Sequence, residues 1–197
     1  MEDTDKLTEL TEEDARELAK RRGTLSLNGL TELSDEAAGA LAEYKGTVLS
    51  LNGLPRITEN LAGLLAKISV ILHLNGLTYL TERTAEELAK QRGMLILDGL
   101  TTLPERTARS LAKHAGLAIS LNGLTVLSDN AAKELSRYEG RLSLYGLVSL
   151  SDKAANSLAM SEADVSLSGL IALSEEAAET LASFKGWVRG KRPDGPK

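Results

Sequence analysis

The 197-residue sequence contains no cysteine and few aromatic residues. Without cysteine there is no disulfide framework, no thiolate metal site and no cysteine nucleophile, which suits a reducing compartment. Aromatic residues make up only 3% of the chain, whereas hydrophobic residues make up 42%. The sequence therefore predicts a globular protein with an aliphatic core.

Long apolar runs are also missing. No stretch approaches the ~20 residues of a membrane-spanning helix, and the acidic start MEDTDKLTEL lacks the basic and apolar regions of a signal peptide. These absences predict a cytoplasmic protein with no membrane partner. The formal net charge is −5 and the one basic cluster is the C-terminal RGKRPDGPK, so we expect no nucleic-acid partner. We interpret residues 188–197 as a flexible basic tail.

A repeat of 23 or 24 residues runs through nearly the whole sequence. Its most regular feature is a Gly-Leu pair, with a leucine two residues before the glycine and another aliphatic residue two residues before that leucine. This alternation has the period of a short strand with one buried side. The seven pairs are Gly29-Leu30, Gly53-Leu54, Gly76-Leu77, Gly99-Leu100, Gly123-Leu124, Gly146-Leu147 and Gly169-Leu170.

A helical pattern follows each predicted strand, and one more opens the chain. An alanine and a leucine three residues apart lie on one face of each helix, and a serine or threonine N-cap precedes all but one, where Pro104 stands instead. Glycine ends most of the helical segments and predicts left-handed C-caps. Val70 and Ala163 replace it and predict irregular corners. The N-caps are Thr11, Ser34, Thr58, Thr81, Ser128, Ser151 and Ser174.

These patterns predict an α/β solenoid. A short strand and an eleven-residue helix cannot bury their apolar faces alone, so successive units must stack into a parallel sheet with a second layer of helices. Strands pack at ~4.8 Å and helices at ~8 to 10 Å, which places about seven strands on the concave side and about eight helices on the convex side. We expect one domain over residues 1–187, with a capping half-repeat at 1–23 and seven strand–helix repeats at 24–186.

The repeat resembles a leucine-rich repeat. Leu25, Leu27, Leu30 and Leu33 followed by SDEAAGALA are similar to the cysteine-containing, ribonuclease-inhibitor-like motif in a short, bacterial-type version. The resemblance covers about residues 6–186, and Leu30 and its equivalents stand where that motif has Asn or Cys. It implies a horseshoe with a protein-binding surface on the concave face or its rims.

The residues between the repeated leucines face outward and vary between units. In the middle of the sheet they form an apolar patch rimmed by polar groups, which is typical of an interaction site; a C-terminal segment that covers the patch is the alternative. The open sheet offers on the order of 450 Å², less than the ~800 Å² per partner of a standard interface, so a protein partner would also use the loops. The candidate partner-binding residues are Val48, Ile71, His73, Met94, Ile96, Asp98 and Tyr145.

Candidate catalytic and metal-binding residues are sparse. His73 stands on an outward strand position and His114 at a helix end that we expect to face water, each without a partner at a characteristic spacing. A column of asparagines favours hydrogen bonds along the stack over a ligand site, because calcium needs several converging carboxylates and only Asp98 belongs to the column. We expect no enzymatic activity, no cofactor and no metal.

Two hypotheses for function remain open. The first is a non-enzymatic interaction module that binds a protein or peptide through its concave face and the adjacent loops. The alternative is a structural or assembly protein with weak self-association through the solenoid ends, since GWVRG at 186–190 resembles only the start of an eighth strand. We expect Trp187 to pack over the last unit.

Overall fold

The computed structural model describes residues 4–161, 163–182 and 187–188. Over these residues, α-helices alternate with strands of one parallel sheet. The strands are β1 (Thr24–Ser26), β2 (Val48–Ser50), β3 (Ile71–His73), β4 (Met94–Ile96), β5 (Ala118–Ser120), β6 (Arg141–Ser143), β7 (Asp164–Leu167) and β8 (Trp187–Val188). The helices are the 3₁₀ turn η1 (Thr4–Lys6), α1 (Glu12–Ala19), α2 (Asp35–Leu41), α3 (Glu59–Leu65), α4 (Glu82–Leu88), α5 (Glu105–Leu111), α6 (Asp129–Leu135), α7 (Asp152–Ala159) and α8 (Glu175–Ala182).

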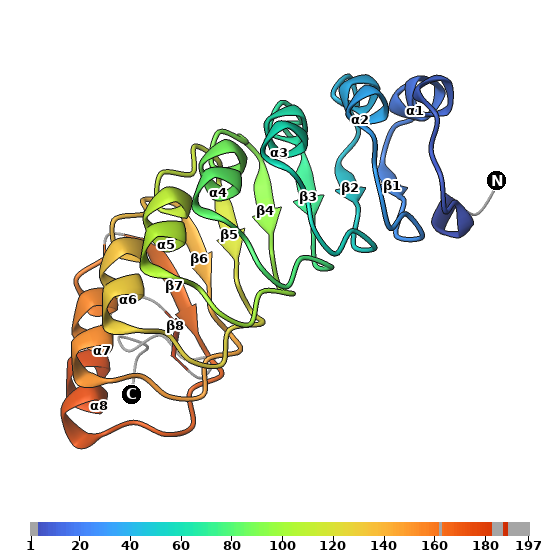
Figure 1. The fold of residues 1–197 in the computed structure, drawn as a ribbon. Coiled ribbons are helices and arrows are strands. Elements are labelled where there is room, and N and C mark those ends of the chain that lie inside the picture. The colour runs from blue at the N-terminus through green and yellow to red at the C-terminus, as the bar shows by residue number, and fades with distance from the viewer. Residues whose placement is uncertain (1–3, 162, 183–186, 189–197) are drawn as a thin grey trace.

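The strands lie in chain order along the inner side of an arc, and the helices line its outer side (Figure 1). The register places equivalent residues of neighbouring units side by side, for example Thr24 beside Val48 and Ile71 beside Met94. The predicted solenoid with a concave parallel sheet is therefore confirmed. The short β8 pairs with β7 and extends the sheet past the seven predicted strands. The predicted tail beyond residue 188 and the side chain of Trp187 lie outside the described residues.

The repeated leucines and alanines form one continuous core. Leu27, Leu74 and Leu97, each two residues before a Gly-Leu glycine, are fully buried. The paired alanines and leucines of the helices are buried as well, except Ala178 on α8, which lies in the last helix of the described stack. Serine and threonine cap the helices as predicted. Ser34 Oγ, for example, accepts a hydrogen bond from the Ala37 amide at 3.1 Å.

Glycine follows each asparagine position because neighbouring units approach closely there. A Cβ atom at Gly53 would lie 2.2 Å from the Asn28 carbonyl oxygen and 2.3 Å from that of Leu30. The backbone φ does not explain the glycines, because among the described residues only Gly23 has a positive value, 82°. The prediction of left-handed C-caps is therefore wrong for the other helix-end glycines of the described chain, which are Gly46, Gly93, Gly116 and Gly140.

The side chain two residues before each of these glycines fills the corner between helix and strand. Tyr44 Oη donates a hydrogen bond to the Gly23 carbonyl at 2.6 Å, and Gln91 Nε2 donates one to the Val70 carbonyl at 2.7 Å. A Cβ atom at Gly46 would lie 2.0 Å from Tyr44 Oη. At Gly46 and Gly140 a tyrosine hydroxyl leaves no room for a Cβ, and at Gly93 and Gly116 a Cβ would also meet a backbone carbonyl oxygen of the preceding unit, at 2.0 and 2.1 Å.

The two corners without glycine have shorter side chains in the filling position. Ile68 is fully buried two residues before Val70, and that corner has the same turn pattern as the next one, between α4 and β4. The irregularity predicted at Val70 is therefore wrong. Before Ala163, Ser161 Oγ accepts from the Ala163 amide at 3.1 Å and donates to the Ser136 carbonyl at 2.9 Å. In both corners the shorter residue leaves room for a Cβ.

A ladder of asparagine side chains joins the units, and η1 starts it. Asn28 Oδ1 accepts from Ser50 Oγ at 2.7 Å and from the Asn52 amide at 2.9 Å. Asp5 in η1 makes the equivalent bonds, accepting from Ser26 Oγ at 2.7 Å and the Asn28 amide at 2.9 Å. These bonds stabilise the carboxylate and lower the pKa of Asp5. The stacking role predicted for the asparagine column is confirmed, and the N-terminal half-repeat shares it.

Candidate functional site

The inner face of the sheet carries few charges. Three outward-facing columns run across β1–β7 and their exits, and their only Asp, Glu, Lys or Arg residues are Asp98, Arg141 and Asp164. The chain as a whole is 26% charged. Depletion of charge together with methionine, tyrosine and arginine is the composition of the centre of protein interfaces. The inner face is therefore the best candidate site in the described part of the chain.

The predicted binding residues lie on this face. The register places Val48 beside Ile71, Ile71 beside Met94, and His73 beside Ile96. The leucines between them point into the core, so the predicted division into inward and outward positions is confirmed. Their role in binding stays a prediction. Tyr145 is 50% exposed, and the half-buried members are Val48, Ile71, His73, Met94, Ile96 and Asp98.

A hollow of about 260 Å³ opens on the inner face over β4–β7. It brings together three of the predicted residues, Met94, Ile96 and Tyr145, while the other four lie outside its lining. The structure adds residues that the sequence analysis did not select. These are Ala118, Ile119, Ser120, Arg141, Leu142, Ser143, Asp164 and Ser166.

The hollow results from a step in side-chain size. Ala118 pairs with Met94, and Ser120 pairs with Ile96, across the β4–β5 ladder. Small side chains in β5 thus lie directly beside large ones in β4 and form a floor below them. This step can be read from the sequence once the outward columns are aligned, because Ala118 follows Val48, Ile71 and Met94 in one column.

Arg141 and Asp164 form an ion pair on the wall of the hollow. Arg141 Nε lies 3.6 Å from Asp164 Oδ2, and their side chains are 79% and 52% exposed. An exposed pair of this kind contributes little stability. It neutralises the two charges where β6 and β7 begin.

Asp98 differs from these two residues because no cation of the described residues pairs with it. Its Oδ1 accepts from Ser120 Oγ at 2.6 Å and from the Asn122 amide at 2.9 Å. Its Oδ2 has a long contact of 3.4 Å with Asn122 Nδ2. Since Ser120 lines the hollow, Asp98 places a carboxylate at the hollow's edge.

His114 does not face water as predicted. It is 6% exposed in the corner between α5 and β5, with neither ring nitrogen in a hydrogen bond. Burial lowers the pKa of His114, and the backbone carbonyls around the ring oppose that shift only in part. The ring lies 6.0 Å from that of Tyr138, whose pKa burial raises to about 12. His114 therefore occupies the corner-filling position, although its ring is too short and rigid to make the bonds of Gln91.

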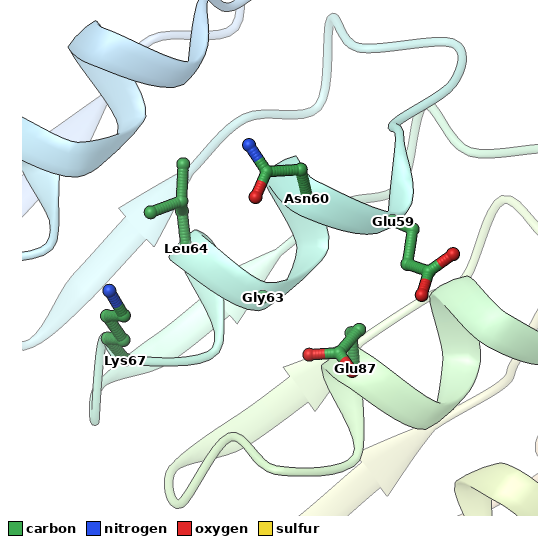
Figure 2. Close-up of a pocket in the computed structure, with 6 residues that line it drawn as sticks. All are labelled: Glu59, Asn60, Gly63, Leu64, Lys67 and Glu87. Atoms are coloured by element: carbon green, nitrogen blue, oxygen red, sulfur yellow. The ribbon is translucent and has the colours of Figure 1, made fainter.

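A second hollow, of about 510 Å³, lies on the helical side over α3 and α4 (Figure 2). Gly63 leaves the space open, and Glu59, Lys67 and Glu87 surround it. Its carboxylates already have partners, since Glu59 pairs with Arg83 at 3.7 Å and Glu87 with Lys90 at 2.5 Å. A shallow site whose carboxylates already pair with cations outside its lining is a weaker candidate than the inner face.

Two other kinds of site are absent from the described residues. No group of three or more His, Asp or Glu side chains there is arranged to hold a metal ion. No helix of that part of the chain has the length and apolarity needed to cross a bilayer. Neither finding adds a candidate to the inner face.

Comparisons with known proteins returned a similar structure but no matching family. No protein-family model matches the chain, and no curated protein matches it. A solved leucine-rich-repeat protein of Leptospira interrogans is similar at 16% identity and a TM-score of 0.34, over 91% of this chain and 69% of that one. The fold assignment rests on the strand order and burial of the chain itself, which make it an α/β solenoid of leucine-rich-repeat-like units.

Proposed function

We propose that this chain is a non-enzymatic protein–protein interaction module that binds a protein or peptide through its concave face and adjacent loops. The observation that supports the proposal is the charge-poor apolar patch on an otherwise charged molecule. Val48, Ile71 and Met94 are half-buried neighbours across three strands, with Ile96 next to them. Apolar surface gathered in one place and rimmed by polar groups favours association with another macromolecule.

The rim of the sheet extends this surface. Tyr79 is 60% exposed and Val126 is 63% exposed, each in a loop that follows a strand. On the same rim, a ladder beside the main sheet joins Val148 to its neighbours, since the Val148 amide donates to the Thr125 carbonyl at 3.1 Å and its carbonyl accepts from Ile171 at 3.0 Å. A partner that contacts both sheet and rim would bury more than the sheet alone provides.

The same proposal includes the organisation of the chain. We take residues 1–187 as one solenoid domain with a capping half-repeat at 1–23 and repeats at 24–186, and the residues that follow as a basic tail. The tail begins after Val188 and not at it, as the sequence had predicted, because Val188 of β8 pairs with Leu167. We assign the repeats to a short version of the cysteine-containing, ribonuclease-inhibitor-like subtype because their sequence is similar to that motif. A cytoplasmic location is proposed because the chain contains no cysteine.

The test is a triple variant, Ile71→Asp, Met94→Asp and Ile96→Asp. We expect it to lose capture of partner proteins, identified by mass spectrometry and then tested in purified form, because three charges would be desolvated in the interface. The matched control is Leu117→Asp with Met160→Asp, which changes side chains that are 74% and 77% exposed at the opposite rim. The control should retain capture. Partner binding by a folded triple variant would contradict the proposal.

The alternative, assembly through the solenoid ends, is favoured by one observation. Ala178 is exposed on α8, whereas its equivalents in the preceding helices are covered by a following helix. At the other end, the bonds of Asp5 to Ser26 and Asn28 already cover β1. Light scattering over a concentration series separates the two proposals, because end-to-end assembly predicts growing oligomers and a concave-face binder predicts a constant mass.

A further inference from the structure

The hollow over β4–β7 has the size of one large side chain rather than of a whole small-molecule ligand. Its volume of about 260 Å³ lies below the ~300–1,000 Å³ typical of pockets for drug-sized molecules. Met94 and Ile96 provide apolar walls, and Ala118 with the serines provides a low floor. Such a recess fits a bulky aliphatic or aromatic side chain from a partner segment.

The charges around the hollow are unequal on its two sides. Arg141 and Asp164 lie where β6 and β7 begin and neutralise one another. Asp98 lies past the end of β4, diagonally across the sheet, and forms no ion pair in the described chain. A cationic group is therefore attracted to the Asp98 side, and the net charge of −5 acts in the same direction.

Asp98 is also the one carboxylate of the asparagine column in β1–β7. In β1, β2 and β5 the asparagine amide donates to a serine of its own strand, as Asn52 Nδ2 does to Ser50 Oγ at 2.9 Å; in β3 His73 stands in the serine position. In β4 that serine is replaced by Ile96, so an amide at position 98 would lose this acceptor. The carboxylate keeps both bonds to the next unit through Oδ1 and leaves Oδ2 with only the long Asn122 contact.

We propose that the hollow binds one bulky apolar side chain of a partner segment, and that Asp98 pairs with a lysine or arginine next to it in that segment. The inference rests on the proposed function and adds the chemistry of the partner. The partner is thus an apolar–basic peptide or an exposed loop with that pattern. Because the pair forms at the edge of an apolar recess, partial desolvation strengthens it above an open surface pair.

The experiment screens the full chain against a library of random nonapeptides and measures the dissociation constants of the selected peptides. Two variants test the two halves of the site. Ala118→Met fills the hollow with a methionine, the residue found at the equivalent position 94 of the neighbouring strand. Asp98→Asn introduces the asparagine that most other units have at this position. Thr24→Met is the matched control, because Thr24 is exposed in the same column on β1, away from the hollow.

We expect the selected peptides to carry a bulky apolar residue within two positions of a lysine or arginine. Ala118→Met should weaken their binding at least about tenfold, since the anchor side chain loses its site. Asp98→Asn should raise the dissociation constants of these peptides about three- to tenfold. Added salt should reduce the difference in affinity between this variant and the parent chain. Thr24→Met should leave binding unchanged.

The contrary results separate the two proposals. The inference is overturned if the selected peptides bind Ala118→Met as tightly as the parent chain, or if they show no preference for lysine or arginine. The proposed function still stands in that case if the triple variant with Asp at positions 71, 94 and 96 does not bind these peptides. Peptides that bind the triple variant equally overturn both. A library that yields no hollow-dependent peptide overturns the inference. A last variant changes Arg189, Lys191 and Arg192 to serine. If the selected peptides bind this variant tenfold more tightly than the parent chain, the chain's own tail competes for the hollow, and the inference of a separate partner is overturned.

Discussion

Two carboxylates on opposite faces of the solenoid have opposite surroundings. Glu134, on the helical face in α6, has a side chain 7% exposed, lies 3.1 Å from Arg109 Nη2 and also pairs with Arg137. The arginines lower the pKa of Glu134. Asp98, on the inner face, has no cation beside it in the described chain and keeps one oxygen with a single long contact. The carboxylate of Glu134 is thus occupied within the fold, whereas that of Asp98 has no cation beside it in the described chain.

The two faces also differ in how their residues vary from one repeat to the next. On the outer side, Arg83–Glu59 and Arg106–Glu82 join successive helices at 3.7 and 3.8 Å, so neighbouring units share their charges. On the inner side, the columns change from Val48 to Ala118 and from Asn75 to Asp98 without loss of register. A face that keeps its geometry while its chemistry changes is suited to recognition.

The largest expected effect separates inward from outward residues of one strand segment. Leu97→Ala should destabilise the chain by about 2–5 kcal/mol, because it leaves a cavity in the core. Ile96→Ala, one residue earlier and half-buried, should cost about 1 kcal/mol or less. Denaturant unfolding followed by circular dichroism measures both. Equal losses would show that Ile96 belongs to the core and would remove the distinction between the two positions.

The next effect compares the two carboxylates directly. Glu134→Gln should cost about 1–2 kcal/mol, because it breaks charge-assisted hydrogen bonds near the helix surface. Asp98→Asn should cost within about 0.5 kcal/mol, because asparagine serves the same ladder in other units. The folded-state pKa of Glu134 is lowered, so its contribution is present above the ordinary value of about 4.5 and is lost as the pH falls through the folded pKa. Stability against pH for the parent and Glu134→Gln chains checks this sign.

A smaller effect concerns the corner at His114. His114→Gln should stabilise the chain by about 1 kcal/mol, because glutamine in this position satisfies donors and acceptors that the buried imidazole leaves unpaired. The pKa of His114 is lowered, so the unfolded chain takes up a proton first and stability falls as the pH drops below about 6.5 towards the folded pKa. The variant should lose that part of the pH dependence. Unchanged profiles in thermal melts between pH 5 and 8 would contradict the assignment.

The smallest effect is expected for the exposed ion pairs of the outer face. Arg83→Ala should cost less than about 0.5 kcal/mol, because its side chain is 80% exposed and salt and water screen the pair. The measurement is chemical denaturation at low and high salt. A cost as large as that of Glu134→Gln would mean that the helix-to-helix ion pairs act as one network.

Part of the candidate site was accessible from the sequence because a strand has period two. Once Leu95 and Leu97 are assigned to the core, Met94 and Ile96 must face outward, and the structure agrees. The hollow was missed, although its cause, Ala118 beside Met94, is visible when the columns are aligned. His114 was misplaced because its burial depends on how the corner folds back under the helix, which no local pattern specifies.

The repeated letters by themselves determined the order of strands and helices, the parallel sheet and its inward leucines, since units that cannot bury their apolar faces alone must stack. Only the tertiary structure decided why glycine recurs after each asparagine. The answer is the distance between neighbouring backbones, which leaves no room for a Cβ, and not the backbone φ that the local sequence favours. It also decided that Asp5 begins the asparagine ladder and that Asp98 lies at the edge of a hollow. Contacts between residues 20 or more positions apart depend on how units stack, and that geometry exists only in the folded chain.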